Sequence, residues 1–223
     1  MLESVLTARG LDKRFRSGNQ SVPVLRDLSI RLAHGESLAL TGRSGSGKST
    51  VLNILCGLET PDAGRIEVLG EAFDCRTPET SRSTEARWAR LRRQQIGVVF
   101  QEANLMPALS LLDNVRLRAR LAGQEDESCQ DWLERLNIGE LASRYPDQVS
   151  GGQRQRALLG RTLMQEAELL LLDEPFGALD ARVRIELRRW LRHLHEEFGF
   201  TSIFVTHDQE EAMELSDRVV VMS

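Results

Sequence analysis

The sequence is poor in several residues that mark particular classes of protein. Its three cysteines form no Cys-x-x-Cys pair and stand too far apart to indicate a metal site or a disulfide framework. With 6 prolines and 17 glycines in 223 residues, it fits neither the collagen-like nor the low-complexity class. No apolar run approaches the roughly 18 residues of a membrane-spanning helix, and residues 1–10 lack a signal-peptide pattern. These absences predict a globular protein of a reducing cytosol.

Lysine is also nearly absent. Only Lys13 and Lys48 occur, and the other 27 of the 29 basic residues are arginine, so this chain uses arginine wherever a generic positive charge suffices. The formal net charge is -4 and the isoelectric point is near 5.7. The chain as a whole therefore lacks the positive field that usually drives nucleic-acid binding. We expect no nucleic-acid partner, and we expect a specific reason for each lysine.

Short strand-like segments alternate with helical ones, which is typical of an α/β sheet. Strands are expected at 37–41, 66–69, 96–100, 169–173, 202–206 and 218–222. Two of them are continuously apolar, as in strands that are covered on both faces of a mostly parallel sheet. Between about 101 and 161 helical spacing replaces the strand-like runs. The pattern predicts a sheet domain with an inserted helical lobe.

A phosphate-binding loop is predicted between the strand at 37–41 and a helix at 50–56, where the chain matches GxxxxGK[ST]. Its glycines let successive N–H groups converge on phosphates at the start of a helix. Lys48 is expected to reach the β- and γ-phosphates, and the Ser49 hydroxyl is expected to bind Mg²⁺. The alternative is a simple glycine-rich turn. The residues expected to contact nucleotide here are Gly42, Arg43, Ser44, Gly45, Ser46, Gly47, Lys48, Ser49 and Thr50.

Two further strands end in residues suited to phosphoanhydride hydrolysis. Asp173 and Glu174 follow an apolar strand, where Asp173 is the expected Mg²⁺ partner through water and Glu174 is expected to polarise the attacking water. His207 closes another buried strand and places an imidazole at the same edge. A solvated strand end would account for the acids equally well, and a capping or core histidine is the alternative for His207.

A second anion-binding motif, Ser150-Gly151-Gly152-Gln153, directly precedes the expected helix 154–164. One phosphate loop already cradles a nucleotide, so this motif is expected to close over the nucleotide of a second copy, about a two-fold axis. A simple helix cap explains the serine but leaves the two glycines and Gln153 unaccounted for.

Together these motifs resemble the nucleotide-binding subunit of ATP-binding cassette (ABC) transporters over essentially the whole chain. The phosphate loop, Gln101, the signature 149–153, Asp173-Glu174, the segment 178–180 and His207 follow in the family's order. The resemblance implies that Gln101 links Mg²⁺ or water to a transmembrane partner, that Asp180 supports the dimer interface, and that Phe15 stacks on adenine. An isolated aromatic residue is more often part of the packing, and Lys13 fits an ordinary surface charge.

The resemblance also implies the architecture and the function. It is that of an α/β P-loop NTPase (RecA-like): a mostly parallel sheet core, an inserted α-helical subdomain and an N-terminal antiparallel β region. We expect a single domain over 1–223, with the ATP-binding core in 1–100 and 162–223 and the helical signature subdomain in 101–161. Such a subunit hydrolyses MgATP, pairs head-to-tail with a second copy, and energises transmembrane permease subunits from the cytoplasmic face of the cell membrane. A groove around 101–115 is expected to receive that partner.

The two halves resemble different branches of the family. Segments such as 55–59 and 104–107 resemble the lipoprotein-releasing and macrolide-export branch, whereas 150–156 and 206–213 resemble importers of sulfate and similar solutes. An engineered or chimeric ABC ATPase domain is therefore one alternative, and the stop after the strand at 218–222 predicts a truncated chain. A cytosolic cassette protein of DNA repair or ribosomes is a second alternative, but such proteins usually carry long coiled-coil insertions or tandem cassettes, and this sequence has neither. A small-molecule kinase with a phosphate loop is a third alternative, but it would leave residues 150–153 without a purpose.

Overall fold

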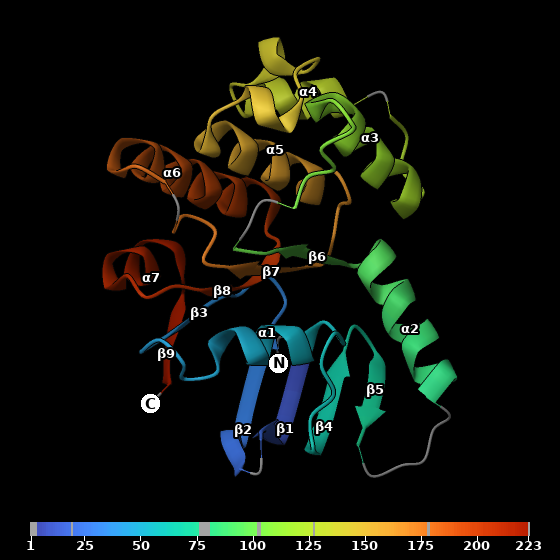
Figure 1. Ribbon diagram of the computed structural model, residues 1–223, viewed down its shortest axis with the longest axis vertical. Helices are drawn as coiled ribbons and strands as arrows, with labels where there is room; N and C mark the ends of the chain where they lie inside the picture. Colours follow the sequence, from blue (N-terminus) through green and yellow to red (C-terminus); the bar gives the residue numbers. More distant parts are fainter. Residues whose placement is uncertain are drawn as a thin grey trace.

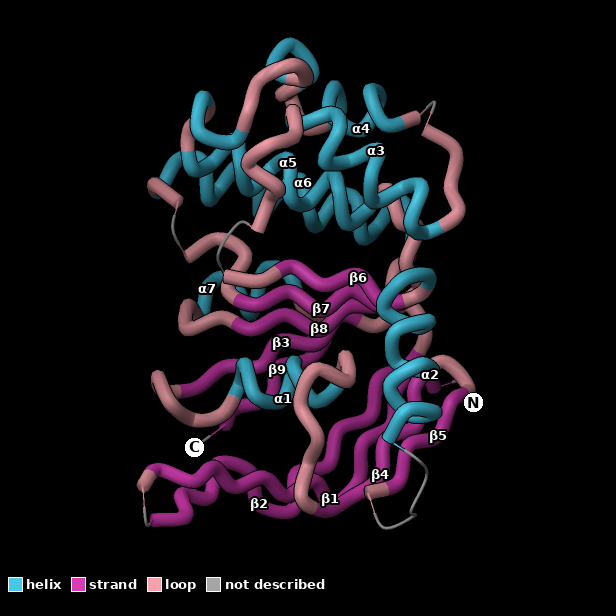
Figure 2. Tube along the Cα trace, turned by 45° about the vertical axis from the view of Figure 1, so that its right-hand side comes forward, coloured by secondary structure: helices cyan, strands magenta, loops and turns pink. Residues whose placement is uncertain are grey.

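The computed structural model describes residues 4–18, 20–75, 81–101, 104–126, 128–177 and 179–222. Figure 1 shows four layers, which are, from bottom to top, an antiparallel sheet, helix α1, a parallel sheet and a group of helices. The tube view in Figure 2 shows the same order of layers after a turn of the molecule. None of the helices in this described part of the chain has the length and apolar character needed to cross a membrane.

The parallel sheet confirms the expected α/β fold. Its strand order is β6-β7-β8-β3-β9, and every neighbouring pair is parallel. The strands are β3 (Ser37–Gly42), β6 (Ile96–Val99), β7 (Leu169–Asp173), β8 (Thr201–Val205) and β9 (Arg218–Met222). The apolar run in β7 is explained by burial on both faces, because Leu171 belongs to the core around α1 and Leu172 to the core beneath the upper helices.

The expected antiparallel region forms a second sheet of order β2-β1-β4-β5. Its strands are β1 (Ser4–Ser17), β2 (Gln20–Ala33), β4 (Ala63–Val68) and β5 (Glu71–Asp74). The register between β1 and β4 shifts after Arg9, and Gly64 lies close to the β1 backbone there. A Cβ on Gly64 would lie 2.6 Å from the Gly10 carbonyl oxygen, and its φ is +110°, so only glycine fits.

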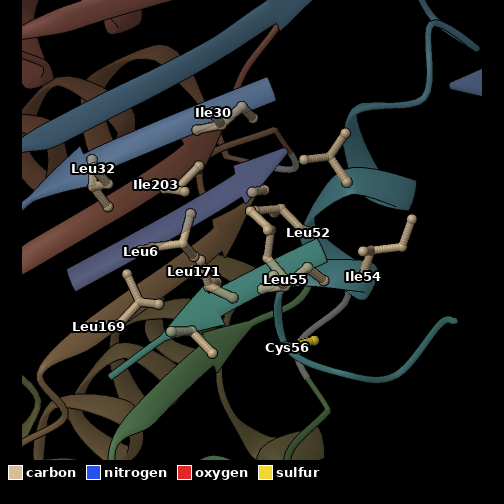
Figure 3. Close-up of a cluster of buried hydrophobic side chains, with 14 of the residues drawn as sticks. Leu6, Ile30, Leu32, Leu52, Ile54, Leu55, Cys56, Leu169, Leu171 and Ile203 are labelled. Carbon is tan, nitrogen blue, oxygen red and sulfur yellow. The ribbon is translucent and has the colours of Figure 1, made fainter. Parts of the chain in front are cut away.

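Helix α1 (Lys48–Leu55) lies between the two sheets. Figure 3 shows how its Leu52 and Leu55 pack among residues from both of them, such as Leu6 of β1 and Leu171 of β7. These four side chains are at most 2% exposed, so α1 is covered on two opposite sides. Helix α2 (Ser81–Gln94) then leads from the antiparallel sheet to β6.

The upper layer contains the helices of the segment 101–161, where helical spacing was expected. These are α3 (Leu111–Ala122), α4 (Cys129–Arg135), the short 3₁₀ turns η1 (Gly139–Leu141) and η2 (Pro146–Gln148), and α5 (Gly151–Leu163). Helix α6 (Ala181–Phe198) joins them in this layer, and α7 (Gln209–Leu215) lies beside β8. Leu158 of α5 and Leu191 of α6 pack with Phe204 of β8 in one core. This core fastens the helices to the upper face of the parallel sheet.

Candidate functional site

The loop between β3 and α1 takes a shape that only glycines permit at its key positions. Gly45 has φ +81° and Gly47 has φ +91°, which are left-handed conformations. A Cβ on Gly47 would lie 2.8 Å from Cγ1 of Val24, so the loop also packs closely against β2. Gly47 is the N-cap of α1 and supplies no side-chain cap. The first N–H groups of α1 therefore remain available for an anion.

The Lys48 side chain folds back over this loop. Its Nζ donates hydrogen bonds to the carbonyl oxygens of Gly42 and Arg43, each at 2.9 Å, and the residue is only 6% exposed. A compact ammonium group fits between these carbonyls, whereas the planar fork of an arginine needs more room. The positive charge is thus held at the mouth of the loop.

The end of β7 meets the start of α1. The Ser49 hydroxyl donates to Oδ1 of Asp173 at 3.2 Å. Burial raises the pKa of Asp173; the Ser49 hydrogen bond opposes this rise, the nearby Glu174 carboxylate adds to it, and Lys48 opposes it. The two oxygens lie close enough for a hydrogen bond, and hard oxygen ligands of this kind suit Mg²⁺.

Glu174 is the central residue of the site. Nε2 of Gln101 donates to its Oε2 at 3.3 Å, and Nδ1 of His207 lies 3.5 Å from its Oε1. The Glu174 backbone has φ 44° and its N–H donates to the Val205 carbonyl oxygen at 3.0 Å. A non-glycine residue in this conformation is strained, and such strain is common at functional sites. The structure therefore brings Gln101, Glu174 and His207 together.

A cavity of about 520 Å³ opens between these groups. It is lined by Phe15, Val24, Ser44, Gly45, Gly47, Lys48, Ser49, Thr50, Gln101, Glu174 and His207. Of the loop residues expected to contact nucleotide, Gly42, Arg43 and Ser46 lie outside this lining. Val24 was missed by the sequence analysis, because an apolar residue on a strand carries no sign of a ligand.

Phe15 forms one wall of the cavity, and Lys13 lies beside it. Phe15 lines the cavity and is 39% exposed, and the Lys13 ammonium lies 5.1 Å from the centre of its ring. The interpretation of Lys13 as a surface charge is wrong, since the residue is only 8% exposed. Its Nζ donates to Oε1 of Glu59 and to the Thr60 carbonyl oxygen, both at 2.6 Å. Lys13 thus supports Phe15 through the contact between its ammonium group and the ring.

The donor groups fit a nucleotide with Mg²⁺. The Ser46 hydroxyl is buried and has no hydrogen-bond partner within the described part of the chain, although it belongs to the phosphate loop. No group of three or more His, Cys, Asp or Glu side chains converges among the residues that the structure describes. A cation bound here would share a few protein oxygens with phosphate groups, as Mg²⁺ does in nucleotide sites.

The motif 150–153 starts α5 and forms a complete capping box. The Ser150 hydroxyl accepts from the Gln153 N–H at 3.3 Å, and Oε1 of Gln153 accepts from the Ser150 N–H at 2.8 Å. A Cβ on Gly152 would lie 2.9 Å from Cγ1 of Val183 on α6. Local structure thus accounts for Gln153 and Gly152. The expectation that a helix cap leaves these two residues unaccounted for is therefore wrong. A Cβ on Gly151, by contrast, would make only an ordinary contact, 3.9 Å from Nη2 of Arg154.

None of these four residues lines the cavity around Lys48. Asp180 also lies outside its lining and is exposed as the N-cap of α6, where its Oδ1 accepts from the N–H groups of Arg182 and Val183 at 3.1 and 3.0 Å. Its neighbour Ala178 lies outside the described residues. The motif 150–153 and the cavity around Lys48 therefore lie on separate surfaces of one chain.

Comparison with known sequences matches residues 25–177 to the model of a family described as ABC transporter. The sulfate/thiosulfate import ATP-binding protein CysA of Yersinia pseudotuberculosis is 47% identical over 209 residues, which are 90% of this chain and 54% of that protein. The protein of the same name from Pseudomonas aeruginosa is 44% identical over 223 residues, 96% of this chain and 63% of its own length. The chain thus spans less than two thirds of these relatives.

Two solved structures share the fold. The ATP-binding cassette MJ0796, as a dimer in a post-hydrolysis state bound to ADP and Pi, superposes with a TM-score of 0.86 at 28% identity, over 98% of this chain and 94% of that one. A second dimeric structure of MJ0796, described as a bacterial ABC transporter cassette, gives a TM-score of 0.84 at 31% identity, over 97% and 94% of the two chains.

Proposed function

Because this chain belongs to the ABC transporter family, we propose that it is an ATP-binding and ATP-hydrolysing transporter subunit. The observation that carries the proposal is the position of Glu174. Its carboxylate lies between Gln101 and His207, on a cavity that Lys48 and the glycine-rich loop also line. This is where a base has to lie to act on water beside a terminal phosphate.

The roles of the residues follow from these positions. Lys48 turns from the loop carbonyls to the β- and γ-phosphates, and Phe15 offers a ring to the base of the nucleotide. Ser49 and Asp173 would hold Mg²⁺, with Gln101 nearby. When bound, Mg²⁺ neutralises the charge that develops on the phosphate oxygens.

Glu174 accepts a proton from the attacking water. For this, hydrogen-bond donors have to hold its carboxylate in position beforehand. Gln101 donates to one carboxylate oxygen and His207 lies beside the other. Most of the rate enhancement in phosphoryl transfer comes from such positioning and from charge stabilisation.

A second copy of the chain is needed to complete the site. Ser150, Gly151, Gly152 and Gln153 present a capped helix start outside the cavity of their own chain. In a head-to-tail pair, this surface of one copy faces the phosphate loop of the other, and each nucleotide lies between two chains. The two dimeric cassette structures with the same fold support this arrangement.

A groove for the membrane partner lies on the side of the molecule near Gln101. This cavity of about 350 Å³ is lined by Leu58, Arg92, Ile96, Val98, Phe100, Asn104, Met106, Asn114, Leu117, Arg118, Leu121, Arg161, Thr162 and Gln165. Leu58, Met106 and Leu121 are about half exposed there. Exposed apolar side chains rimmed by arginines suit a helix of a transmembrane permease subunit. We propose that the chain acts at the inner face of the cell membrane. The names of the relatives favour import as the direction of transport.

Glu174→Gln tests the function. The variant should lose about 10²-fold or more in ATP turnover, because the amide cannot accept a proton from water. It should retain ATP and accumulate as a dimer, which is measured by bound nucleotide and by light scattering after size-exclusion chromatography with MgATP. Glu168→Gln is the matched control, because Glu168 precedes β7 at its opposite end and is exposed. Parental turnover in Glu174→Gln removes this residue from its role.

A further inference from the structure

The side chain of Arg184 lies between two segments that flank the site. From its place near the start of α6, its Nη2 donates to the Leu179 carbonyl oxygen at 3.1 Å. On the other side, its Nη1 lies 4.0 Å from Oδ2 of Asp208 and its Nε lies 3.9 Å from Oε1 of Glu211. One guanidinium group thus contacts the segment before Asp180 and the segment after His207.

The acidic side of this contact fixes the turn that carries His207. Glu211 is only 5% exposed, and its Oε2 accepts from the Thr206 hydroxyl at 2.6 Å. The same hydroxyl accepts from the Asp208 N–H at 3.0 Å. The residues on both sides of His207 are therefore tied to one buried carboxylate. A shift of Glu211 is expected to move the turn, because the Thr206 hydroxyl is bonded both to Glu211 and to the Asp208 N–H.

The other side of the contact fixes the start of α6. Asp180 caps this helix, and the Leu179 carbonyl oxygen that Arg184 binds belongs to the preceding residue. Arg184 is shielded from water, with 29% of its side chain exposed. Its Nε is buried and lacks a hydrogen-bond partner in the described chain. Toward the two carboxylates the guanidinium group is held by charge alone, at distances beyond hydrogen bonding, so a small displacement of α6 changes its contact with Glu211 and Asp208.

We propose that Arg184 is a positioning residue that couples the segment around Asp180 to the turn that carries His207. This rests on the proposed function, in which His207 supports Glu174, and on the expectation that Asp180 supports the interface with a second copy. When the second chain presses on Asp180, α6 carries Arg184 against the Asp208 and Glu211 carboxylates. In the single chain Nδ1 of His207 already lies 3.5 Å from Oε1 of Glu174. The formed pair then holds His207 in this place, which links the arrival of the second copy to hydrolysis.

A second arginine of α6 provides a control within the same pair of helices. Arg188 is 7% exposed, and its Nε lies 3.2 Å from Oε2 of Glu214 on α7. It joins α6 to α7 as Arg184 does, but among the described residues no hydrogen bond or ion pair connects it to Leu179 or to the turn at His207. Loss of either arginine removes a partly buried ion pair between the two helices, so both changes are expected to lower stability.

The experiment compares Arg184→Met, Arg184→Lys and Arg188→Met in the full chain. Arg184→Met should lower kcat for MgATP by about 10-fold with the KM for ATP unchanged, because the nucleotide contacts stay in place. Arg184→Lys should recover part of this loss. Arg188→Met should lower the melting temperature and keep the parental kcat. Combining Arg184→Met with Glu211→Gln should cost less than the two separate losses together.

Hydrogen exchange provides a readout that does not depend on turnover. The Asp208 N–H should exchange faster in Arg184→Met than in Arg188→Met, because only the first change releases the turn. Equal exchange and equal kcat in these two variants overturn the coupling. Absence of turnover in the parent contradicts the proposed function instead, and the exchange rates then decide the coupling alone. If Arg184→Met does not fold, Glu211→Gln and Arg184→Lys replace it in the comparison with Arg188→Met. A lower kcat and a faster exchange of the Asp208 N–H than in Arg188→Met are then expected, and equal values overturn the coupling.

Discussion

Both lysines of this arginine-rich chain are buried; Lys48 lines the cavity of the candidate site, and Lys13 lies beside Phe15 of that lining. Lys13 and Lys48 each donate two hydrogen bonds through Nζ, and at least one acceptor in each case is a backbone carbonyl oxygen. A small ammonium group fits into such sites and a planar guanidinium group does not. The expectation that each lysine has a specific role agrees with these two environments.

A glycine after α1 provides a test of packing at the residue scale. Gly57 has φ +69°, and a Cβ at this position would overlap the ring of Trp88 on α2. Gly70 has φ +77° and no neighbouring atom within 4 Å of the same position. Gly70→Ala should therefore cost about 1 kcal/mol in the free energy of unfolding, for backbone strain alone. Gly57→Ala should cost about 3 kcal/mol, because the overlap adds to that strain.

Urea unfolding of the two glycine variants and the parent gives these free energies. The difference between the variants isolates the contact with Trp88. Equal losses for Gly57→Ala and Gly70→Ala would mean that α2 moves away without cost, and that its packing on the end of α1 is loose.

At the scale of elements, two helices start with the same kind of cap and differ in what they face. The Ser110 hydroxyl caps α3 by accepting from the Asp113 N–H at 3.1 Å, and Ser150 caps α5 in the same way. Ser110→Ala and Ser150→Ala should each cost about 1 kcal/mol in stability. Only Ser150→Ala should also lower ATP turnover, since the proposed pair places its hydroxyl at the nucleotide of the second copy.

Thermal or urea unfolding and an ATPase assay on both serine variants separate the two effects. Ser110→Ala serves as the control for a lost helix cap. A parental turnover in Ser150→Ala, with the expected loss of stability, would reduce the motif to a helix cap.

The strands of the parallel sheet could be predicted because burial on two faces demands continuous apolar runs such as 169–172. The bounds of β1 and β2 could not be predicted in this way. One face of that sheet meets α1 and the other meets water, and register shifts interrupt its alternation near Gly10 and Leu11. Helix α7 was missed because it is short, although Asp208 followed by Glu210 and Glu211 marks a capped helix start.

The chemistry of the site was easier to predict than its supports. Phosphate loops and paired acids are restricted to few residue types, so Lys48, Asp173 and Glu174 are visible in the sequence alone. The supports depend on residues far away in the chain. Lys13 is buried by Glu59 and Thr60, and Arg184 meets Glu211 only because α6 and α7 lie side by side. No local pattern announces such a contact.

At the scale of the whole molecule, the proposed shared site predicts complementation between two inactive variants. In the proposed pair, Lys48→Met removes the phosphate contact, and Gly151→Asp places a negative charge where the motif of one copy would face the γ-phosphate of the other. Gly151 is suited to this change because a Cβ there would make only an ordinary contact, 3.9 Å from Nη2 of Arg154, so the fold is kept. A mixed pair has one intact site, formed by Lys48 of one variant and Gly151 of the other.

Mixing equal amounts of the two variants should restore about a quarter of the parental turnover, because half of the pairs are mixed and each has one of two sites. The ATPase rate is measured against the mixing ratio, with each variant alone as the control. Failure to restore any turnover, although light scattering shows mixed pairs, contradicts the shared site.

Helix α1 is fixed between two sheets, and its first residues are the phosphate loop. A receptor built on so confined an element has its shape before any ligand arrives. Binding of the triphosphate then needs little ordering of the loop itself, and most of the conformational entropy lost on binding falls on the surfaces that come together between the two copies. The slow step of the cycle is accordingly expected to be association or separation of the two chains, rather than accommodation of the nucleotide within one of them.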